Sequence, residues 1–405
     1  MFPPLNEQLD AIKRGVSEII REDDLVRKIE HSINTGTPLN VKLGCDPSRP
    51  DLHLGHSVVL RKLRQFQDLG HQAILIVGDF TGMIGDPSGR SKTRPPLTLD
   101  ETRVNGQSYL TQATNILSAS RLRMQYNSDW LGGMSFADVI ALGAKYTVAR
   151  MLERDDFEKR YRGGEPISIH ELLYPLAQAM DSVAIRADIE LGGTDQKFNL
   201  LVGRDIQREY GQDPQVTITL PILPGTDGVE KMSKSLDNYI GITDSPAEMY
   251  GKTLSIPDTL IYQYFLLTTT VPAGELASIR SLLESQKGNP RDLKRRLARE
   301  LVTLYHSADA ARAAEAEFDR IFVKKGVPDE IPDVTLSGTE SSVPILRILT
   351  EARLAASNSE ARRLVEQGGV SVNGKTIHDY KAVIETRNGV LLQVGKRKFA
   401  RVRTA

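Results

Sequence analysis

The chain has 405 residues, of which 40% are hydrophobic and 26% are charged; this composition excludes a disordered chain and supplies a large core. Its 52 Lys and Arg residues balance its 52 Asp and Glu residues, and no apolar run reaches the roughly 18 residues of a membrane span. We expect no secretory signal at Met1–Asp10 and no internal disulfide from the single Cys45, so a cytoplasmic protein of two or three domains is predicted.

The first 80 residues predict a helix followed by a βαβ unit. Apolar residues spaced by three and four indicate an amphipathic helix over 5–20. Alternation at 39–43 predicts a short strand, and Asp51 can cap a helix over 52–70. The apolar run 73–77 is typical of a strand buried on both faces. Strand, helix and strand within about 45 residues imply a parallel sheet.

The same alternation of strand and helix returns further along the chain. We expect, in order, a Gly-, Pro- and Ser-rich loop over 81–96, helices over 99–120, 136–152 and 169–183, a strand over 184–191, a helix over 195–210 and a strand over 216–223. The chain beyond Ser245 is mostly helical up to about Phe322. The predicted fold is therefore α/β.

A small basic unit closes the chain. Residues 342–405 hold 12 Lys or Arg against 5 Asp or Glu, a net charge of +7, so the rest carries −7. This asymmetry indicates a polyanion-binding appendage, although a solvated basic surface explains the charge alone equally well. An Asn373-Gly374 turn lies between apolar alternations. The expected domains are a Rossmann-type catalytic domain with a helical insertion at 1–240, a helical domain at 241–325, a linker at 326–341 and a small α+β domain at 342–405.

Two histidines open the predicted helix that follows the first buried strand. They form the motif His53-Leu54-Gly55-His56. The amino end of a helix attracts anions, and imidazole N–H groups can donate to phosphate oxygens. Taken alone, such a pair is more often a cap or a surface feature. A metal site is less favoured, because no third Cys or His joins the pair.

A lysine-rich loop, Lys231-Met232-Ser233-Lys234-Ser235, follows the last predicted strand of the sheet. Two lysines three residues apart, with hydroxyls between and beside them, can surround a triphosphate, and a mobile loop suits closure over substrate. An exposed basic turn is the simpler alternative. A specified five-residue string occurs by chance on the order of once in ten thousand, which makes coincidence a poor explanation.

Together the two motifs resemble the signatures of the class I aminoacyl-tRNA synthetases. Four longer stretches are similar to tyrosyl-tRNA synthetases, best to their second bacterial subtype: 41–47, 85–90, 174–181 and 192–196. The likeness covers nearly the whole chain, and the basic carboxy-terminal unit resembles the RNA-binding module named after ribosomal protein S4.

The resemblance implies a reaction in which ATP activates L-tyrosine and tRNA(Tyr) accepts it. It implies catalytic roles for His53, His56, Lys231, Lys234, Arg90 and Arg94, and an ATP site made by Gly44, Gly55, Gly192, Gly193, Asp195 and Lys234. Such chemistry needs positioning and charge stabilisation and no side-chain nucleophile. Mg²⁺ is expected with ATP, without a tightly bound cofactor or a metal site in the protein.

The amino-acid pocket must recognise a phenol hydroxyl, and such a pocket can reject phenylalanine by roughly 10⁴–10⁵. The resemblance assigns Asp181 to that hydroxyl. It assigns Tyr174, Gln178 and Asp86 to the α-ammonium group, with Gln196 and Asp46 lining the cleft. Tyr174, Gln178 and Asp181 share one face of a helix by their spacing. Lys42 stands where a tyrosine commonly contacts the phenol, and it too can donate.

The carboxy-terminal unit is expected to bind tRNA through Arg362, Arg363 and Lys375, since such cations contact phosphates. The resemblance also implies a homodimer with an interface near 146–151, and no membrane partner. Three alternatives remain: a tryptophanyl enzyme, a small nucleotidylyltransferase and a non-catalytic RNA-binding descendant. The Asp181 face argues against a tryptophanyl enzyme, and the lysine loop argues against a nucleotidylyltransferase. The presence of all four phosphate-handling residues argues against a non-catalytic descendant.

Overall fold

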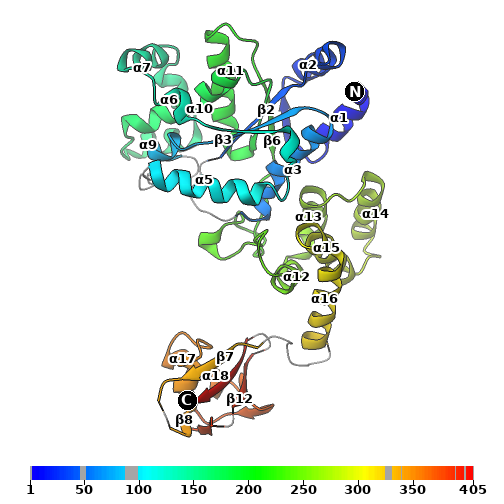
Figure 1. Cartoon of the computed structure of the whole chain (residues 1–405), viewed down its shortest axis with the longest axis vertical. Coiled ribbons are helices and arrows are strands. Elements are labelled where there is room, and N and C mark those ends of the chain that lie inside the picture. Colours follow the sequence, from blue (N-terminus) through cyan, green and yellow to red (C-terminus); the bar gives the residue numbers. More distant parts are fainter. Residues whose placement is uncertain are drawn as a thin grey trace. The chain divides into compact units, whose positions relative to one another are not determined.

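A computed structural model describes residues 2–45, 52–86, 99–323, 331–338, 340–387, 389–395 and 398–404 (Figure 1). The chain divides into two compact units, Met1–Ala311 and Arg312–Ala405. We describe each unit by itself. In the ranges that the structure describes, no helix is both long enough and apolar enough to cross a bilayer.

The first unit is built on a six-stranded sheet with the order β1-β6-β5-β2-β3-β4. Its strands are β1 (Glu18–Ile20), β2 (Asn40–Cys45), β3 (Gln72–Val77), β4 (Leu122–Tyr126), β5 (Ile189–Gly193) and β6 (Val216–Leu220). All neighbours are parallel except β1, which runs antiparallel to β6. The predicted α/β fold with a parallel sheet is confirmed. The strand order reverses between β2 and β5, where open α/β sheets form their ligand crevice.

Helices cover both faces of the sheet (Figure 1). The long ones of this layer are α2 (Glu22–Thr35), α3 (Leu54–Asp68), α5 (Leu99–Ala113), α10 (Ile169–Ile185) and α11 (Lys197–Glu209). Helices α10 and α11 pack closely on each other. Strand β3 has five buried residues after Gln72, so its continuous apolar sequence reflects helices on both sides.

The amino-terminal prediction was wrong in part. Helix α1 ends at Lys13, and the residues that continue its apolar spacing form strand β1 instead. Gly15 adopts a φ of +70°, which L-residues avoid and which ends the helix. Ile19 then pairs with Ile218 at the sheet edge. Hydrogen bonding to β6 at the sheet edge therefore favours a strand here over the helix that the apolar spacing predicts.

Other predicted boundaries shift for local reasons. The predicted strand over 184–191 begins only at Ile189, because α10 continues to Ile185 and Arg186 turns the chain with a φ of 50°. The predicted helix over 136–152 is two pieces, α7 (Phe136–Gly143) and α8 (Val148–Met151). Short helices α4 (Thr81–Ile84), α6 (Ser128–Leu131) and α9 (Asp155–Gly163) complete this region.

The rest of the first unit is helical, as its sequence predicts. It contains α12 (Pro246–Ser255), α13 (Ile261–Thr268), α14 (Ala273–Glu284) and α15 (Pro290–Tyr305), and α16 (Ala308–Phe318) runs across the boundary. Helix α13 contacts α3 of the sheet layer.

The second unit is a small α+β body. Its larger sheet has the order β10-β9-β12-β13-β7 and a smaller one pairs β11 with β8. The elements are β7 (Asp333–Leu336), β8 (Ser342–Pro344), α17 (Ile345–Glu351), α18 (Asn358–Glu366), β9 (Val370–Val372), β10 (Lys375–Ile377), β11 (Val383–Glu385), β12 (Val390–Val394) and β13 (Lys398–Thr404). Strand β7 lies inside the segment whose composition suggests a linker, yet it pairs with β13. Asn373 and Gly374, with φ of 50° and 80°, make the turn predicted between apolar alternations.

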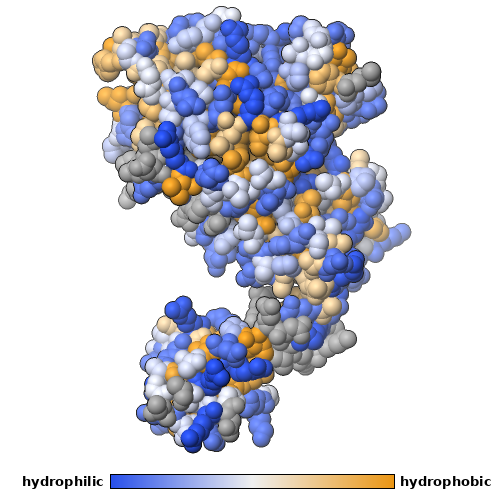
Figure 2. Space-filling view, viewed as in Figure 1, coloured by the Kyte–Doolittle hydropathy of each residue, from blue (hydrophilic) through white to orange (hydrophobic). Residues whose placement is uncertain are grey.

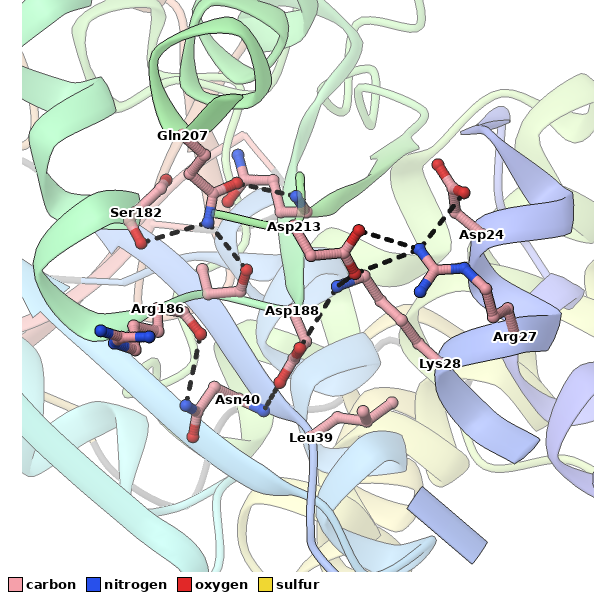
Figure 3. A network of polar contacts seen from close by, with 12 residues as sticks. Asp24, Arg27, Lys28, Leu39, Asn40, Ser182, Arg186, Asp188, Gln207 and Asp213 are labelled. Atoms are coloured by element: carbon pink, nitrogen blue, oxygen red, sulfur yellow. Dashed lines mark hydrogen bonds and ion pairs between the residues drawn. The ribbon is translucent and has the colours of Figure 1, made fainter. Parts of the chain in front are cut away.

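A polar network joins α2 to the amino ends of β2 and β5 (Figure 3). The buried ammonium of Lys28 lies 2.8 Å from Asp213 and 3.3 Å from Asp188. The other oxygen of Asp188 accepts from the Asn40 backbone N–H at 2.9 Å. Arg27 also pairs with Asp213, at 3.0 Å. One buried cation thus holds two partly exposed carboxylates from different segments.

Replacing Lys28 by Met should therefore lower the free energy of unfolding by about 2–3 kcal/mol, because two carboxylates lose a desolvated counter-charge. Urea denaturation at pH 7 measures this. The matched control is Lys13→Met, which removes an exposed pair with Glu22 and should cost less than about 1 kcal/mol. Equal losses in the two variants would contradict a structural role for the Lys28 network.

Candidate active site

A cavity of about 230 Å³ opens at the carboxyl ends of the central strands. Its lining comes from both sides of the point where strand order reverses, as expected of a ligand site in this fold. The lining residues are Leu43, Gly44, Cys45, His56, Val59, Ile76, Gly78, Thr81, Asp86, Tyr109, Tyr174, Gln178, Asp181, Leu191, Gly192, Gly193, Gln196 and Leu200. Nine of the predicted site residues are among them: Gly44, His56, Asp86, Tyr174, Gln178, Asp181, Gly192, Gly193 and Gln196.

Helix α10 presents Tyr174, Gln178 and Asp181 to this cavity. The side-chain oxygen of Gln178 is buried and has no hydrogen-bond donor among the described residues. A buried acceptor without a partner is costly, so it is a place where a ligand donor would be gained. Asp181 is only 3% exposed and accepts a hydrogen bond from the Trp130 indole at 3.0 Å.

Burial is the largest influence on the pKa of the Asp181 carboxyl. It raises the pKa of this carboxyl to about 7, and the charge of Glu190 acts in the same direction. Lys42 and hydrogen bonds from Trp130 and Asn127 oppose the rise. The group therefore changes charge near neutral pH, unlike a solvent-exposed aspartate.

Lys42 is completely buried and contacts Gln178, which lines the cavity. Its ammonium is 2.8 Å from Glu190 on the neighbouring strand, 2.8 Å from the Ser182 hydroxyl and 3.1 Å from the Gln178 backbone oxygen. Three acceptors match the three N–H donors of a lysine. A direct contact of Lys42 with a phenol stays a prediction.

The histidine motif forms the amino end of α3. His53 is the N-cap, and its Nδ1 accepts from the Gly55 backbone N–H at 3.2 Å. The Nδ1 of His56 accepts in turn from the His53 backbone N–H at 3.2 Å. A Cβ on residue 55 would meet the His53 ring at 3.0 Å, so glycine lets this ring fold back over the helix end. Asp51, the predicted cap, lies outside the described residues.

These caps fix the tautomers of both rings. Because each Nδ1 accepts a hydrogen bond, the proton of each neutral ring resides on Nε2. Burial lowers the pKa of His53 to about 2 and that of His56 to about 4, assisted by the charge of Lys234. Both imidazoles are therefore neutral donors at physiological pH.

The lysine loop lies directly beside the histidine motif. His53 forms an isolated β-bridge with Gly241, and the Leu54 N–H donates to the Ile240 carbonyl at 2.9 Å. Lys231 lies 3.6 Å from the carboxylate of Asp195, and Lys234 lies 5.5 Å from the centre of the Tyr239 ring. A Cβ on Gly55 would lie 3.5 Å from that of Met232, so two motifs about 180 residues apart in sequence are adjacent.

Sequence reasoning missed the residues that hold this loop in shape. Asn238 is buried; its oxygen accepts from the Ser233 N–H at 2.8 Å, and its amide donates to Asp227 at 2.6 Å. Sequence reasoning also missed two residues of the cavity region, Tyr109, which lines the cavity, and Trp130, which donates to Asp181. An isolated Asn, Asp or aromatic residue carries no periodic signal, but the Asn three residues after the lysine motif could have been noticed.

The two glycines at the end of β5 are tightly enclosed. A Cβ on Gly192 would meet Leu200 at 2.9 Å, and one on Gly193 would meet an Asp195 oxygen at 2.7 Å. Beside these glycines, Gln196 donates to the carboxylate of Asp86 at 3.0 Å. Three predicted residues, Asp46, Arg90 and Arg94, lie outside the described residues. Among those that are described, no three His, Cys, Asp or Glu side chains converge as metal ligands do.

The predicted tRNA-binding residues belong to the second unit. Arg362 and Arg363 are exposed on α18, and Lys375 is exposed on β10. Arg362 donates to Glu366 at 2.8 Å and lies 4.2 Å from the centre of the Tyr380 ring. A guanidinium held against an aromatic ring keeps its charge and presents a flat surface.

Comparisons with known families agree with this geometry. The family described as tRNA synthetases class I (W and Y) matches residues 34–323. The domain described as the Tyrosine–tRNA ligase SYY-like C-terminal domain matches residues 323–402.

Individual relatives are similar over their whole length. A tyrosine–tRNA ligase of Salinibacter ruber is 56% identical over 99% of this chain and 98% of its own. One from Chlorobium luteolum is 59% identical over 100% of this chain and 99% of its own. A solved tyrosyl-tRNA synthetase of Archaeoglobus fulgidus, complexed with L-tyrosine, covers 77% of this chain and 99% of its own at 24% identity with a TM-score of 0.63, which shows a shared fold. The chain therefore belongs to the tyrosine–tRNA ligases, within the class I tRNA synthetases.

Proposed function

We propose that this chain activates L-tyrosine with ATP at the cavity described above and then transfers the tyrosyl group to tRNA(Tyr). The observation that carries the proposal is a single cavity that combines the Asp181 face of α10 with His56, whose motif lies against Met232 of the lysine loop. In the first step the tyrosine carboxylate attacks the α-phosphate and pyrophosphate leaves. In the second, a hydroxyl of the terminal ribose attacks the tyrosyl carbonyl and AMP leaves.

The amino acid is held at its two polar ends in this proposal. Asp181 accepts the phenol hydrogen bond, which rejects phenylalanine because the buried carboxylate would then lack that donor. The oxygen of Gln178 accepts from the α-ammonium, together with Asp86 and Tyr174; its lack of a donor in the described structure supports this role. Gln196 and Asp46 complete the cleft.

Neutral histidines and charged lysines and arginines position ATP in this proposal. His53 and His56 offer Nε2–H groups to phosphate oxygens, while Lys231, Lys234, Arg90 and Arg94 offset charge on the leaving pyrophosphate. Asp195 binds the ribose, and its carboxylate lies 3.6 Å from the ammonium of Lys231. Gly44, Gly55, Gly192 and Gly193 keep the backbone accessible to the nucleotide. Mg²⁺ arrives with ATP, and the reaction takes place in the cytoplasm, where tRNA and amino acids meet.

The oligomer we propose is a homodimer that pairs through the helical insertion. Large apolar side chains are exposed there, namely Phe136, Ile140, Val148, Tyr161 and Ile169, at 60–81% of their surface. Figure 2 shows hydrophobic surface at the upper left, where Figure 1 places α7. Several large apolar side chains left exposed in one region are typical of a protein interface.

ATP–pyrophosphate exchange tests the function without tRNA. Exchange should occur with tyrosine and fall by several orders of magnitude with phenylalanine or tryptophan. Lys234→Ala should lower the rate by about 10²–10³, as loss of one charge-stabilising group does. Exchange with tryptophan alone would overturn the substrate assignment, and its absence with all three amino acids would favour an RNA-binding protein.

The acidity of Asp181 predicts a pH dependence. Its pKa is raised to about 7, so the carboxylate that binds the phenol forms as the pH rises through neutrality. We expect kcat/KM for tyrosine to increase between pH 6 and 8, and Asp181→Asn to flatten that profile at a lower value. The two histidines contribute nothing in this range, since their pKa values are about 2 and 4. A profile unchanged in Asp181→Asn would refute the assignment.

The dimer proposal is tested by placing a charge in the exposed apolar surface. Phe136→Asp should convert the dimer to a monomer in sedimentation experiments, because burying an unpaired carboxylate costs more than the interface gains. Leu282→Asp is the control, since Leu282 is 40% exposed on α14, away from the insertion. Dissociation only by changes at such distant surfaces would count against the interface.

The basic second unit predicts salt-dependent tRNA affinity. Arg363→Ala and Lys375→Ala should each weaken tRNA(Tyr) binding and reduce the slope of log affinity against log salt by about 1, because each removes one phosphate contact. Filter binding across a salt series measures both effects. ATP–pyrophosphate exchange should be unchanged in these variants, and an unaltered salt slope would exclude these residues from the RNA contact.

A further inference from the structure

Four polar side chains form a closed ring of hydrogen bonds at one lip of the cavity. Arg154 donates to Asp86 at 3.3 Å and to Asn199 at 3.2 Å. Asn199 donates to the oxygen of Gln196 at 3.1 Å, and Gln196 donates to the second oxygen of Asp86 at 3.0 Å. Asp86 and Gln196 line the cavity, whereas Arg154 and Asn199 are not among its lining residues.

The chemistry of the ring allows only one orientation of each amide. A guanidinium can only donate and a carboxylate can only accept. The oxygen of Asn199 must therefore face Arg154. The N–H₂ group of Asn199 then faces the oxygen of Gln196. Gln196 must then turn its own N–H₂ to Asp86. The charges of Arg154 and Asp86 decide which atom donates and which accepts in every bond. The ring therefore fixes how Gln196 and Asp86 face the cavity.

Arg154 is itself held from several sides. It is 5% exposed, precedes α9 and lies 5.0 Å above the centre of the buried Phe157 ring. Its Nε is 2.8 Å from Asp156. The planar fork of an arginine can serve all these acceptors at once, which a lysine cannot. Asn199, in the first turn of α11, is 1% exposed.

Two carboxylates flank the guanidinium of Arg154. Asp86 lies 3.3 Å and Asp156 lies 2.8 Å from it. Each oxygen of Asp86 accepts one ring bond. The ring therefore sets the orientation of the Asp86 carboxylate at the cavity that this residue lines.

We propose that Arg154 and Asn199 are positioning residues for the amino-acid substrate. They act through Asp86, which receives the α-ammonium group of tyrosine in the proposed function, and through Gln196, which lines the cavity and donates to Asp86. Neither residue contacts ATP in this scheme. The inference rests on the proposed function, because it presupposes that tyrosine occupies this lip of the cavity.

The test compares the KM values for tyrosine and for ATP in pyrophosphate exchange. Exchange by the unchanged protein with tyrosine first establishes the reaction, so a failure there is a failure of the proposed function and not of this inference. Arg154→Met should raise the KM for tyrosine by about 10- to 100-fold, while the KM for ATP changes by less than about threefold. Arg154→Lys should recover part of the loss, since a lysine can still reach one acceptor.

Asn199→Asp separates geometry from charge. The substitution keeps the size of the side chain and the bond from Arg154, but Gln196 then faces a carboxylate at both ends and cannot donate correctly to both. If the ring orientation matters, the KM for tyrosine rises by about tenfold or more. If only the negative charge of the site matters, the added carboxylate lowers that KM, and the proposal is wrong.

Arg204→Met is the matched structural control. Arg204 is a buried arginine of α11 that pairs with Asp24 at 3.2 Å, and it lines no part of the cavity. Its loss should lower the melting temperature without a selective change in the KM for tyrosine. If the KM for tyrosine and the KM for ATP rise equally in Arg154→Met and Asn199→Asp, then Arg154 and Asn199 only stabilise the fold, and the proposal is wrong. Should Arg154→Met fail to fold, Arg154→Lys and Asn199→Asp decide it.

Discussion

The parallel pairing of β2 with β5 is the constraint on which the rest of the first unit depends. Val41, Lys42 and Leu43 lie beside Ile189, Glu190 and Leu191 in register. Because connections leave these two strands in opposite directions across the sheet, their carboxyl ends diverge and leave a crevice. The histidine motif follows β2 and the Gly-Gly-Thr-Asp-Gln segment ends β5. One strand pair therefore brings two chemically distinct segments to the same cavity.

This arrangement buries several charged groups, and two of them are compensated by nearby groups of opposite charge. Lys42 pairs with Glu190 within the strand register, and Arg154 lies between Asp86 and Asp156. Leaving any of these groups unpaired would cost several kcal/mol. Asp181 is compensated less completely, which is why its pKa is raised to about 7. Asp181 and Gln178, whose side-chain oxygen has no donor among the described residues, both line the cavity.

Much of the fold could be predicted because its signals are local. The apolar run at 73–77 and the alternation at 39–43 indicate strands through periodicity within a few residues. The same reasoning failed for β1, whose residues continue a helical spacing. There the deciding interaction is with β6, about 200 residues away. Strand β7 was missed for the same reason, since its partner β13 ends the chain.

The sequence by itself determined the class of sheet, the two signature motifs and the residue types of a nucleotide and amino-acid site, because these are properties of composition and short-range spacing. Only the tertiary structure decided how those residues are held. The bridge from His53 to Gly241 and the ring through Arg154 and Asn199 join segments from separate elements. Hydrogen bonds between segments far apart in the chain leave no periodic trace, so folding alone reveals them.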